Sequence, residues 1–258
     1  MARNFNGALH KIVLGGSITD GVFDVDTAWT YVVIVRPTTL TGGNRTICAK
    51  YSGAGGRQIS LQFTGAGLIR ILQNGSVYAT GTFTFVINTW YIVGATCIGD
   101  GADGSIRCWA YEFDGTQRES GFAGGAVANS TPNDHVIEIG LADGNDPYIG
   151  DTAYHVYVGV EWGDSEFRAF AANPYRAFLA AAGGPFFLPL GLSSPEVDWS
   201  GNDNTGTVTS AVVADMPPVG PPFAHDTPTT IAAAAAALEE DPWQAPRPID
   251  PDNVVSVW

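Results

Sequence analysis

The sequence predicts an all-β protein, a two-sheet antiparallel sandwich followed by an extended Pro-rich C-terminal arm. From residue 5 to about residue 160, short apolar or β-branched runs alternate with clusters of Gly, Asn and Asp, which is typical of strands and turns. The 258 residues include 32 Gly and 16 Pro and only 15% charged residues, a composition that favours turns and short strands over long helices. Hydrophobic residues make up 45% of the chain, which is enough for a substantial core.

Ten strands are expected in this stretch, and turn chemistry supports two of their ends. Asn74-Gly75 favours a type I′ hairpin, because both residues tolerate the left-handed conformation that this turn requires, and Asp114-Gly115 ends another strand in the same way. The expected strands are residues 9–14, 29–36, 46–51, 58–64, 68–73, 76–82, 90–98, 105–113, 136–141 and 153–160.

Period-two alternation within residues 105–113 separates the side chains of that strand into two sets. Ile106, Cys108, Ala110 and Glu112 fall on one face, and the other face carries Arg107, Trp109, Tyr111 and Phe113. We expect the aromatic row to belong to the core.

One amphipathic helix is expected at residues 164–179. Asp164 or Ser165 can cap its start, and Pro174 should kink or divide it. The candidate apolar stripe consists of Phe167, Phe170 and Phe178.

Composition divides the chain into three parts. Residues 1–182 form the expected sandwich, residues 183–225 an extended segment that packs back on it, and residues 226–258 an Ala- and Pro-rich arm. An isolated arm ending in Val254-Val255-Ser256-Val257-Trp258 would expose apolar surface, so it is expected to dock on a neighbour or on its own domain.

The formal net charge of −14 argues against nucleic acid or an anionic membrane as a partner, because phosphate binding needs clustered cations. No secretory signal and no membrane-spanning run is recognised. The three cysteines, Cys48, Cys97 and Cys108, have neither disulfide-framework nor zinc spacing, and they are expected to be buried free thiols.

An ordered series of segments resembles the laminin G-like or concanavalin A-like jelly roll. WTYVVIVRP at residues 29–37, NTWYIV at 88–93 and IRCWAYEFDG at 106–115 are similar to successive strands of that family, and the resemblance covers residues 5–178. Residues 195–208 (PEVDWSGNDNTGTV) are similar to a segment that precedes the first strand in such domains. The resemblance therefore implies that residues 195–208 pack back on the sandwich, as in a circular permutation.

The stretch NPYRAF at residues 173–178 and the Pro-rich tail resemble bacteriophage virion proteins. This resemblance implies a non-catalytic virion structural protein, a capsid decoration or head-surface protein made in the host cytoplasm and found in the virion. Its expected partners are the major capsid protein, other virion subunits and further copies of itself, with a trimer as the natural guess. The residues expected to anchor these contacts are Trp199, Trp243, Val257 and Trp258.

The alternative is a lectin-like adhesin that binds host-surface glycan, with or without calcium. Exposed aromatic side chains near loops could stack on sugars, and Asp and Asn oxygens clustered around a turn could hold Ca²⁺. The glycan candidates are Tyr148, Trp162 and Tyr51, and the calcium candidates are Asp143, Asn145, Asp146 and Asp151.

No catalytic set is recognised, so an enzyme is not expected. Retaining glycoside hydrolysis needs two carboxyl groups about 5 Å apart, and the only close pattern is Glu112-Phe113-Asp114. The group Glu161, Asp164 and Glu166 has the wrong spacing for that pattern. The four histidines, which are widely separated in the sequence, are His10, His135, His155 and His225.

Overall fold

The elements of the fold are fifteen strands and one helix within the described part of the chain. They come from a computed structural model that describes residues 2–7, 9–14, 22–24, 26–52, 56–73, 76–99, 106–113, 116–123, 136–141, 146–174, 186–191, 194–200, 202, 204–215 and 217. In chain order they are β1 (Ala2–Phe5), β2 (Lys11–Leu14), β3 (Ala28–Pro37), β4 (Arg45–Ser52), β5 (Gly56–Phe63), β6 (Leu68–Gln73), β7 (Ser76–Thr84), β8 (Tyr91–Ile98), β9 (Ile106–Tyr111), β10 (Gln117–Ala123), β11 (Ile137–Ile139), β12 (Gly150–Val158), α1 (Asp164–Ala172), β13 (Phe186–Leu188), β14 (Gly206–Thr209) and β15 (Val212–Ala214).

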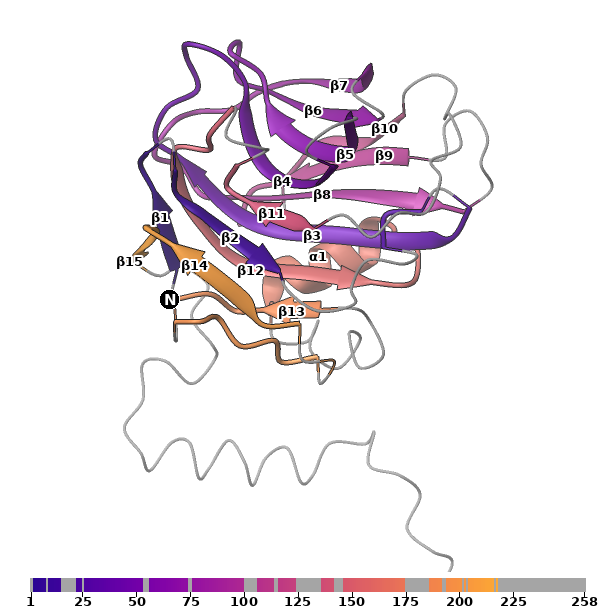
Figure 1. Cartoon of the computed structure of the whole chain (residues 1–258). Coiled ribbons are helices and arrows are strands. Elements are labelled where there is room, and N and C mark those ends of the chain that lie inside the picture. Colours follow the sequence, from indigo (N-terminus) through magenta and orange to yellow (C-terminus); the bar gives the residue numbers. More distant parts are fainter. Residues whose placement is uncertain are drawn as a thin grey trace, which may run out of the picture. The chain divides into compact units, whose positions relative to one another are not determined.

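These strands form two antiparallel sheets, which confirms the predicted sandwich (Figure 1). Sheet A has the order β10-β9-β8-β3-β12-β1-β15, with β13 also paired to β12, and sheet B has the order β14-β2-β11-β4-β5-β6-β7. Each strand expected from the alternation coincides with an observed one. β1, β10, β13 and β15 were not expected, because they are short or, like β10, carry no clear apolar alternation, whereas β14 overlaps the segment 195–208 that was expected to pack back on the sandwich. The two predicted Gly turns, at 74–75 and 114–115, lie outside the described residues.

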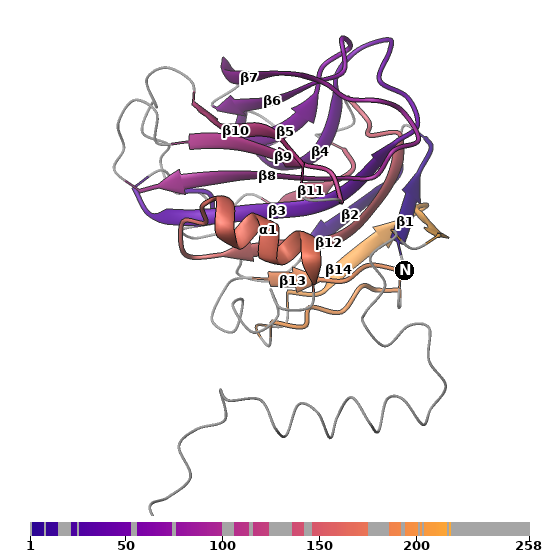
Figure 2. The same ribbon diagram turned by 180° about the vertical axis from the view of Figure 1, so that it is seen from behind.

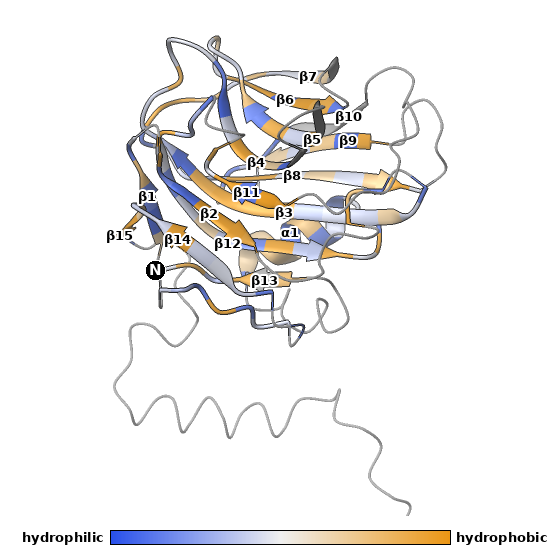
Figure 3. Ribbon diagram, viewed as in Figure 1, coloured by the Kyte–Doolittle hydropathy of each residue, from blue (hydrophilic) through white to orange (hydrophobic). Residues whose placement is uncertain are grey.

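The core between the sheets consists of the inward-facing side chains of both. Phe23 packs edge to face against Trp29 and Tyr157, with ring centroids 5.1 Å apart in each case, and the same core contains aliphatic residues of β2, β3 and β11. The apolar stretches of β3 and β8 stand out in Figure 3. The three cysteines are buried free thiols, as predicted. No helix of the described residues is long and apolar enough to cross a membrane.

A second apolar cluster lies on the outer face of sheet A, beneath α1 (Figure 2). Phe167 stacks on Trp109 and Tyr111 of β9, with centroids 5.3 and 5.7 Å away, and it occupies the space above Gly94, where a side chain would collide with it. The aromatic row of β9 therefore belongs to a core, as predicted, but to the core under the helix.

The start of α1 differs from the prediction. The N-cap is Gly163, whose N–H donates to Oε2 of Glu166 over 2.9 Å, so neither Asp164 nor Ser165 is the cap. The Asp164 carboxylate is instead engaged by side chains of sheet A. The helix ends at Ala172, because Pro174 disfavours helical backbone at the residue before it, and Asn173 is extended. Phe178 lies outside the described residues.

The chain beyond residue 182 returns to both sheets. β14 pairs with β2, and β15 pairs with β1, so this segment forms one edge of each sheet. A buried ion pair joins Arg3 of β1 to Glu196, with 2.5 Å between Nε and Oε1. Residues 218–258, which include the expected arm, lie outside the described residues.

Candidate functional site

Four side chains, three from the adjacent strands β1, β12 and β3 and one from the residue just before β8, form a row on the outer face of sheet A. The register places Asn4 of β1 opposite Asp151 of β12, and Asp151 opposite Arg36 of β3. Because Val35 pairs with Tyr91, Arg36 lies opposite Trp90, the residue just before β8. Trp90 packs against the apolar cluster under α1, which places the row on the face that α1 covers in part. We call Asn4, Asp151, Arg36 and Trp90 the Trp90 row.

The Asp151 carboxylate organises the row. Its Oδ2 accepts hydrogen bonds from Nε and Nη2 of Arg36, at 2.7 and 2.6 Å, and its Oδ1 accepts one from Nδ2 of Asn4 at 2.7 Å. The guanidinium carbon of Arg36 lies 4.9 Å from the centroid of the Trp90 ring, within the range of a cation–π contact. Asp151 is only 2% exposed, whereas the Arg36 side chain is 28% exposed. The row therefore holds a guanidinium in a fixed orientation at the surface.

Three polar groups of the row keep hydrogen-bonding capacity. In the part of the chain that the structure describes, Nη1 of Arg36, Oδ1 of Asn4 and Nε1 of Trp90 make no hydrogen bond to protein. All three side chains are partly exposed. The surface thus offers a ligand in solvent two donors, one of them the indole N–H, and one acceptor.

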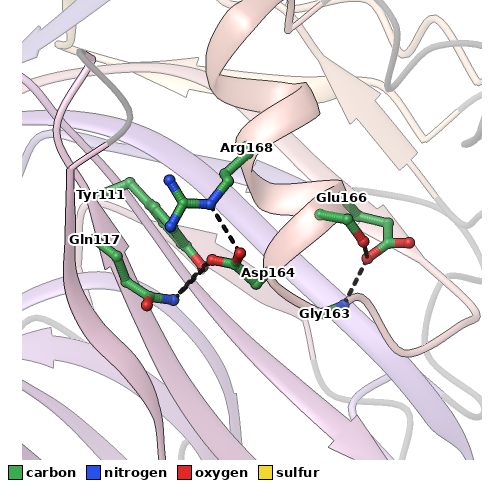
Figure 4. Close-up of polar contacts among 7 residues, drawn as sticks. Tyr111, Gln117, Gly163, Asp164, Glu166 and Arg168 are labelled. Atoms are coloured by element: carbon green, nitrogen blue, oxygen red, sulfur yellow. Dashed lines mark hydrogen bonds and ion pairs between the residues drawn. The ribbon is translucent and has the colours of Figure 1, made fainter.

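A polar cluster lies at the start of α1 (Figure 4), on the same outer face of sheet A as the row. Tyr111 of β9 lies opposite Ile92 of β8. Ile92 is two residues after Trp90, so both side chains point to the same face of sheet A. The Tyr111 hydroxyl donates to Oδ1 of Asp164 over 2.9 Å, and Gln117 donates to both of these oxygens. Nε of Arg168 donates to Oδ2 of Asp164 over 2.8 Å.

The charges of this cluster are settled at neutral pH. The hydrogen bonds from Arg168 and then from Tyr111 lower the pKa of Asp164 below its usual range. Burial, followed by the hydrogen bond to Asp164, raises the pKa of Tyr111. Asp164 is therefore ionised and Tyr111 is protonated, which matches the direction of their hydrogen bond.

The aromatic residues proposed for glycan binding from the sequence are not at this surface. Tyr148 is fully buried between Phe5 and Phe63, and Trp162 is buried against Phe167. Both expectations are corrected, because residues near a loop in sequence can still point into a core. The Tyr51 side chain lies outside the described residues.

The predicted calcium ligands are only partly described. Asp143 and Asn145 lie outside the described residues, and the backbone oxygen of Asp146 accepts the N–H of Thr46 over 2.7 Å. Both carboxylate oxygens of Asp151 accept hydrogen bonds, Oδ2 from Arg36 and Oδ1 from Asn4. No group of three or more His, Cys, Asp or Glu side chains suited to a metal occurs among the described residues.

The remaining candidates are dispersed. Trp199 is 39% exposed on the returning segment, and the other proposed partner anchors (Trp243, Val257 and Trp258) lie outside the described residues. Glu112, from the only carboxylate pattern considered for hydrolysis, is paired with Arg118 at 2.8 Å, and Asp114 is outside the described residues.

Sequence reasoning missed the Trp90 row, although part of its signal was present. Alternation in the strand predicted at residues 90–98 separates Trp90 from the inward-facing Tyr91, which indicates an outward indole. Nothing local indicates that Asn4 lies beside Asp151, because that contact depends on the pairing of β1 with β12.

Comparison with known proteins supports the architecture. No protein-family profile matches the sequence, and no curated protein matches it. A candidate carbohydrate binding protein from Bacteroides ovatus ATCC 8483 has a similar structure, with a TM-score of 0.60 and 16% identity over 83% of this chain and 59% of that chain. The chain therefore spans less than two thirds of that protein.

The native heptameric SAP-like pentraxin from Limulus polyphemus is similar with a TM-score of 0.55 and 11% identity, over 84% of this chain and 97% of that one. At such identities the likeness shows the fold alone, and it agrees with the predicted jelly-roll sandwich. Neither name refers to a virus, so the expected virion role gains no support from them.

Proposed function

We propose that this chain is a non-catalytic carbohydrate-binding protein, and that the Trp90 row is its sugar-binding surface. The observation that carries the proposal is the row itself, in which a partly exposed indole adjoins an ordered guanidinium, carboxylate and amide. This is the lectin-like alternative considered from the sequence, but the binding surface consists of residues other than Tyr148, Trp162 and Tyr51.

The chemistry of the row suits a sugar. The Arg36 guanidinium lies over one face of the Trp90 ring, and the part of the indole that stays exposed can attract the weakly positive C–H groups of a pyranose through its partial negative charge. The Arg36 guanidinium can donate hydrogen bonds to sugar hydroxyls, and the Asn4 amide oxygen can accept them. Asp151 orients both groups before the ligand binds, which lowers the entropy cost of binding. The similar protein from Bacteroides ovatus, a candidate carbohydrate binding protein, lends support.

The test is glycan binding by the full chain and its Trp90→Ala variant, first on a glycan array and then by calorimetry with a bound sugar. We expect the variant to bind about tenfold or more weakly, which corresponds to about 1.4 kcal/mol of lost contact. Trp199→Ala is the matched control, because Trp199 is also partly exposed but lies on the returning segment.

Two results would contradict the proposal. One is that the folded wild-type chain binds no glycan on the array. The other is that Trp90→Ala and Trp199→Ala reduce binding equally, since that would place the site elsewhere. Far-ultraviolet circular dichroism and a melting curve confirm that each variant is folded.

A further inference from the structure

We infer that the sugar recognised by the Trp90 row is neutral, and that Arg36 and Asn4 bind it through its hydroxyl groups. The inference rests on the proposed function and adds the chemical class of the ligand. It follows from how the charges and the open hydrogen-bonding groups of this surface are arranged.

The cations of this surface are already neutralised by protein carboxylates. Nη2 of Arg36 is 2.6 Å from Asp151, and in the cluster at the start of α1 Nε of Arg168 is 2.8 Å from Asp164. A carboxylate or sulfate on a sugar would meet guanidinium groups whose charge is balanced, in a chain with a net charge of −14. An anionic sugar therefore gains little attraction and is repelled by the protein as a whole.

The open groups match hydroxyls instead. Arg36 and Asn4 approach the same carboxylate from opposite sides, so their polar ends lie on either side of Asp151. Nη1 of Arg36 is a donor and Oδ1 of Asn4 is an acceptor. A hydroxyl can donate and accept at once, so hydroxyls of one saccharide can satisfy both groups while a sugar ring rests beside Trp90. An anionic oxygen can only accept, and facing Asn4 Oδ1 it would meet a second acceptor.

The experiment uses the full chain on an array that places each neutral oligosaccharide beside its uronic-acid and sulfated counterparts. We expect neutral members to bind about tenfold or more tightly than their anionic partners at 50 mM NaCl. We expect the affinity for a neutral sugar to change by less than about twofold between 50 and 500 mM NaCl, because no net charge is neutralised on binding.

Two variants test the residues. Arg36→Lys keeps the charge but loses the planar fork, and Asn4→Ala removes the acceptor, so each is expected to weaken neutral-sugar binding about tenfold. Arg118→Lys is the matched control, because Arg118 is also paired with a carboxylate, Glu112, and lies outside the row. It should bind like the wild type.

The outcomes separate the two proposals. Trp90-dependent binding that favours anionic sugars, or falls steeply with salt, overturns the neutral-sugar inference and leaves the proposed function standing. If the Arg36→Lys variant binds a neutral sugar as tightly as the wild type does, the neutral-sugar inference is also overturned and the proposed function stands. An array with no bound glycan of either kind overturns the proposed function itself.

Discussion

His155 is a fully buried polar residue in the core between the sheets. A register shift in β12 between Ala153 and Val156, with Tyr154 at φ 51°, turns His155 toward β3. One ring nitrogen, Nδ1, lies 2.5 Å from the Tyr31 hydroxyl, and Nε2 lies 2.9 Å from Oγ1 of Thr152. A neutral imidazole, which donates from one nitrogen and accepts at the other, satisfies both contacts.

Burial lowers the pKa of His155 to about 3, so the protein should lose stability in mild acid. The unfolded chain takes up the proton near pH 6.5 and the folded protein only near pH 3, so the stabilisation is complete above pH 6.5 and is lost as the pH falls toward 3. Between pH 7 and pH 5 we expect wild type to lose about 2 kcal/mol more than His155→Gln, measured by urea unfolding. Equal losses in the two proteins would show that His155 is not responsible.

At the scale of elements, the packing of α1 against sheet A depends on a glycine, Gly94 of β8. A Cβ on Gly94 of β8 would lie 2.6 Å from Cε1 of Phe167 and 2.7 Å from the backbone oxygen of Tyr31. Phe167 can therefore stack on Trp109 and Tyr111 only because β8 carries a glycine at this point. The same contact holds Asp164 within reach of Tyr111.

Gly94→Ala should therefore loosen the helix and destabilise the protein by about 1–3 kcal/mol, the usual cost of overpacking. Gly159→Ala is the control, because no atom lies within 4 Å of a Cβ at that position, and it should change stability by less than about 0.5 kcal/mol. The urea midpoint provides the measurement. Similar midpoints for the two variants would mean that α1 tolerates a shift of Phe167.

At the scale of the whole molecule, segments at opposite ends of the described chain hold each other. Arg3 and Glu196 are 193 residues apart, and their side chains are only 7% and 1% exposed. Glu196 also accepts the N–H of Gly191 over 2.7 Å, and Arg3 donates to the backbone oxygen of Ala211. The pair connects β1, and thereby Asn4 of the Trp90 row, to the returning segment.

Glu196→Ala should destabilise the protein by about 3 kcal/mol, because it leaves Arg3 as a buried cation without its carboxylate. Glu112→Ala breaks the more exposed pair with Arg118 and should cost less than about 1 kcal/mol. Chemical unfolding of both variants at pH 7 gives the comparison. A smaller loss for Glu196→Ala than for Glu112→Ala would contradict the connecting role of the buried pair.

The sequence by itself determined the all-β class, most of the sandwich strands and the two faces of β9. These features follow from period-two alternation and turn residues, which are local, and β6 begins and ends where the alternation predicts.

Only the tertiary structure decided which residues from distant parts of the sequence come into contact. Asn4 and Asp151 are 147 residues apart, and Arg36 and Asp151 are 115 apart, so their row exists only once β1, β12 and β3 have paired in one register. The burial of Tyr148 and Trp162 was likewise decided by packing. Long-range strand pairing has no local signature, because any strand with the right alternation could accept several partners, and the choice among them depends on the energy of the whole sandwich.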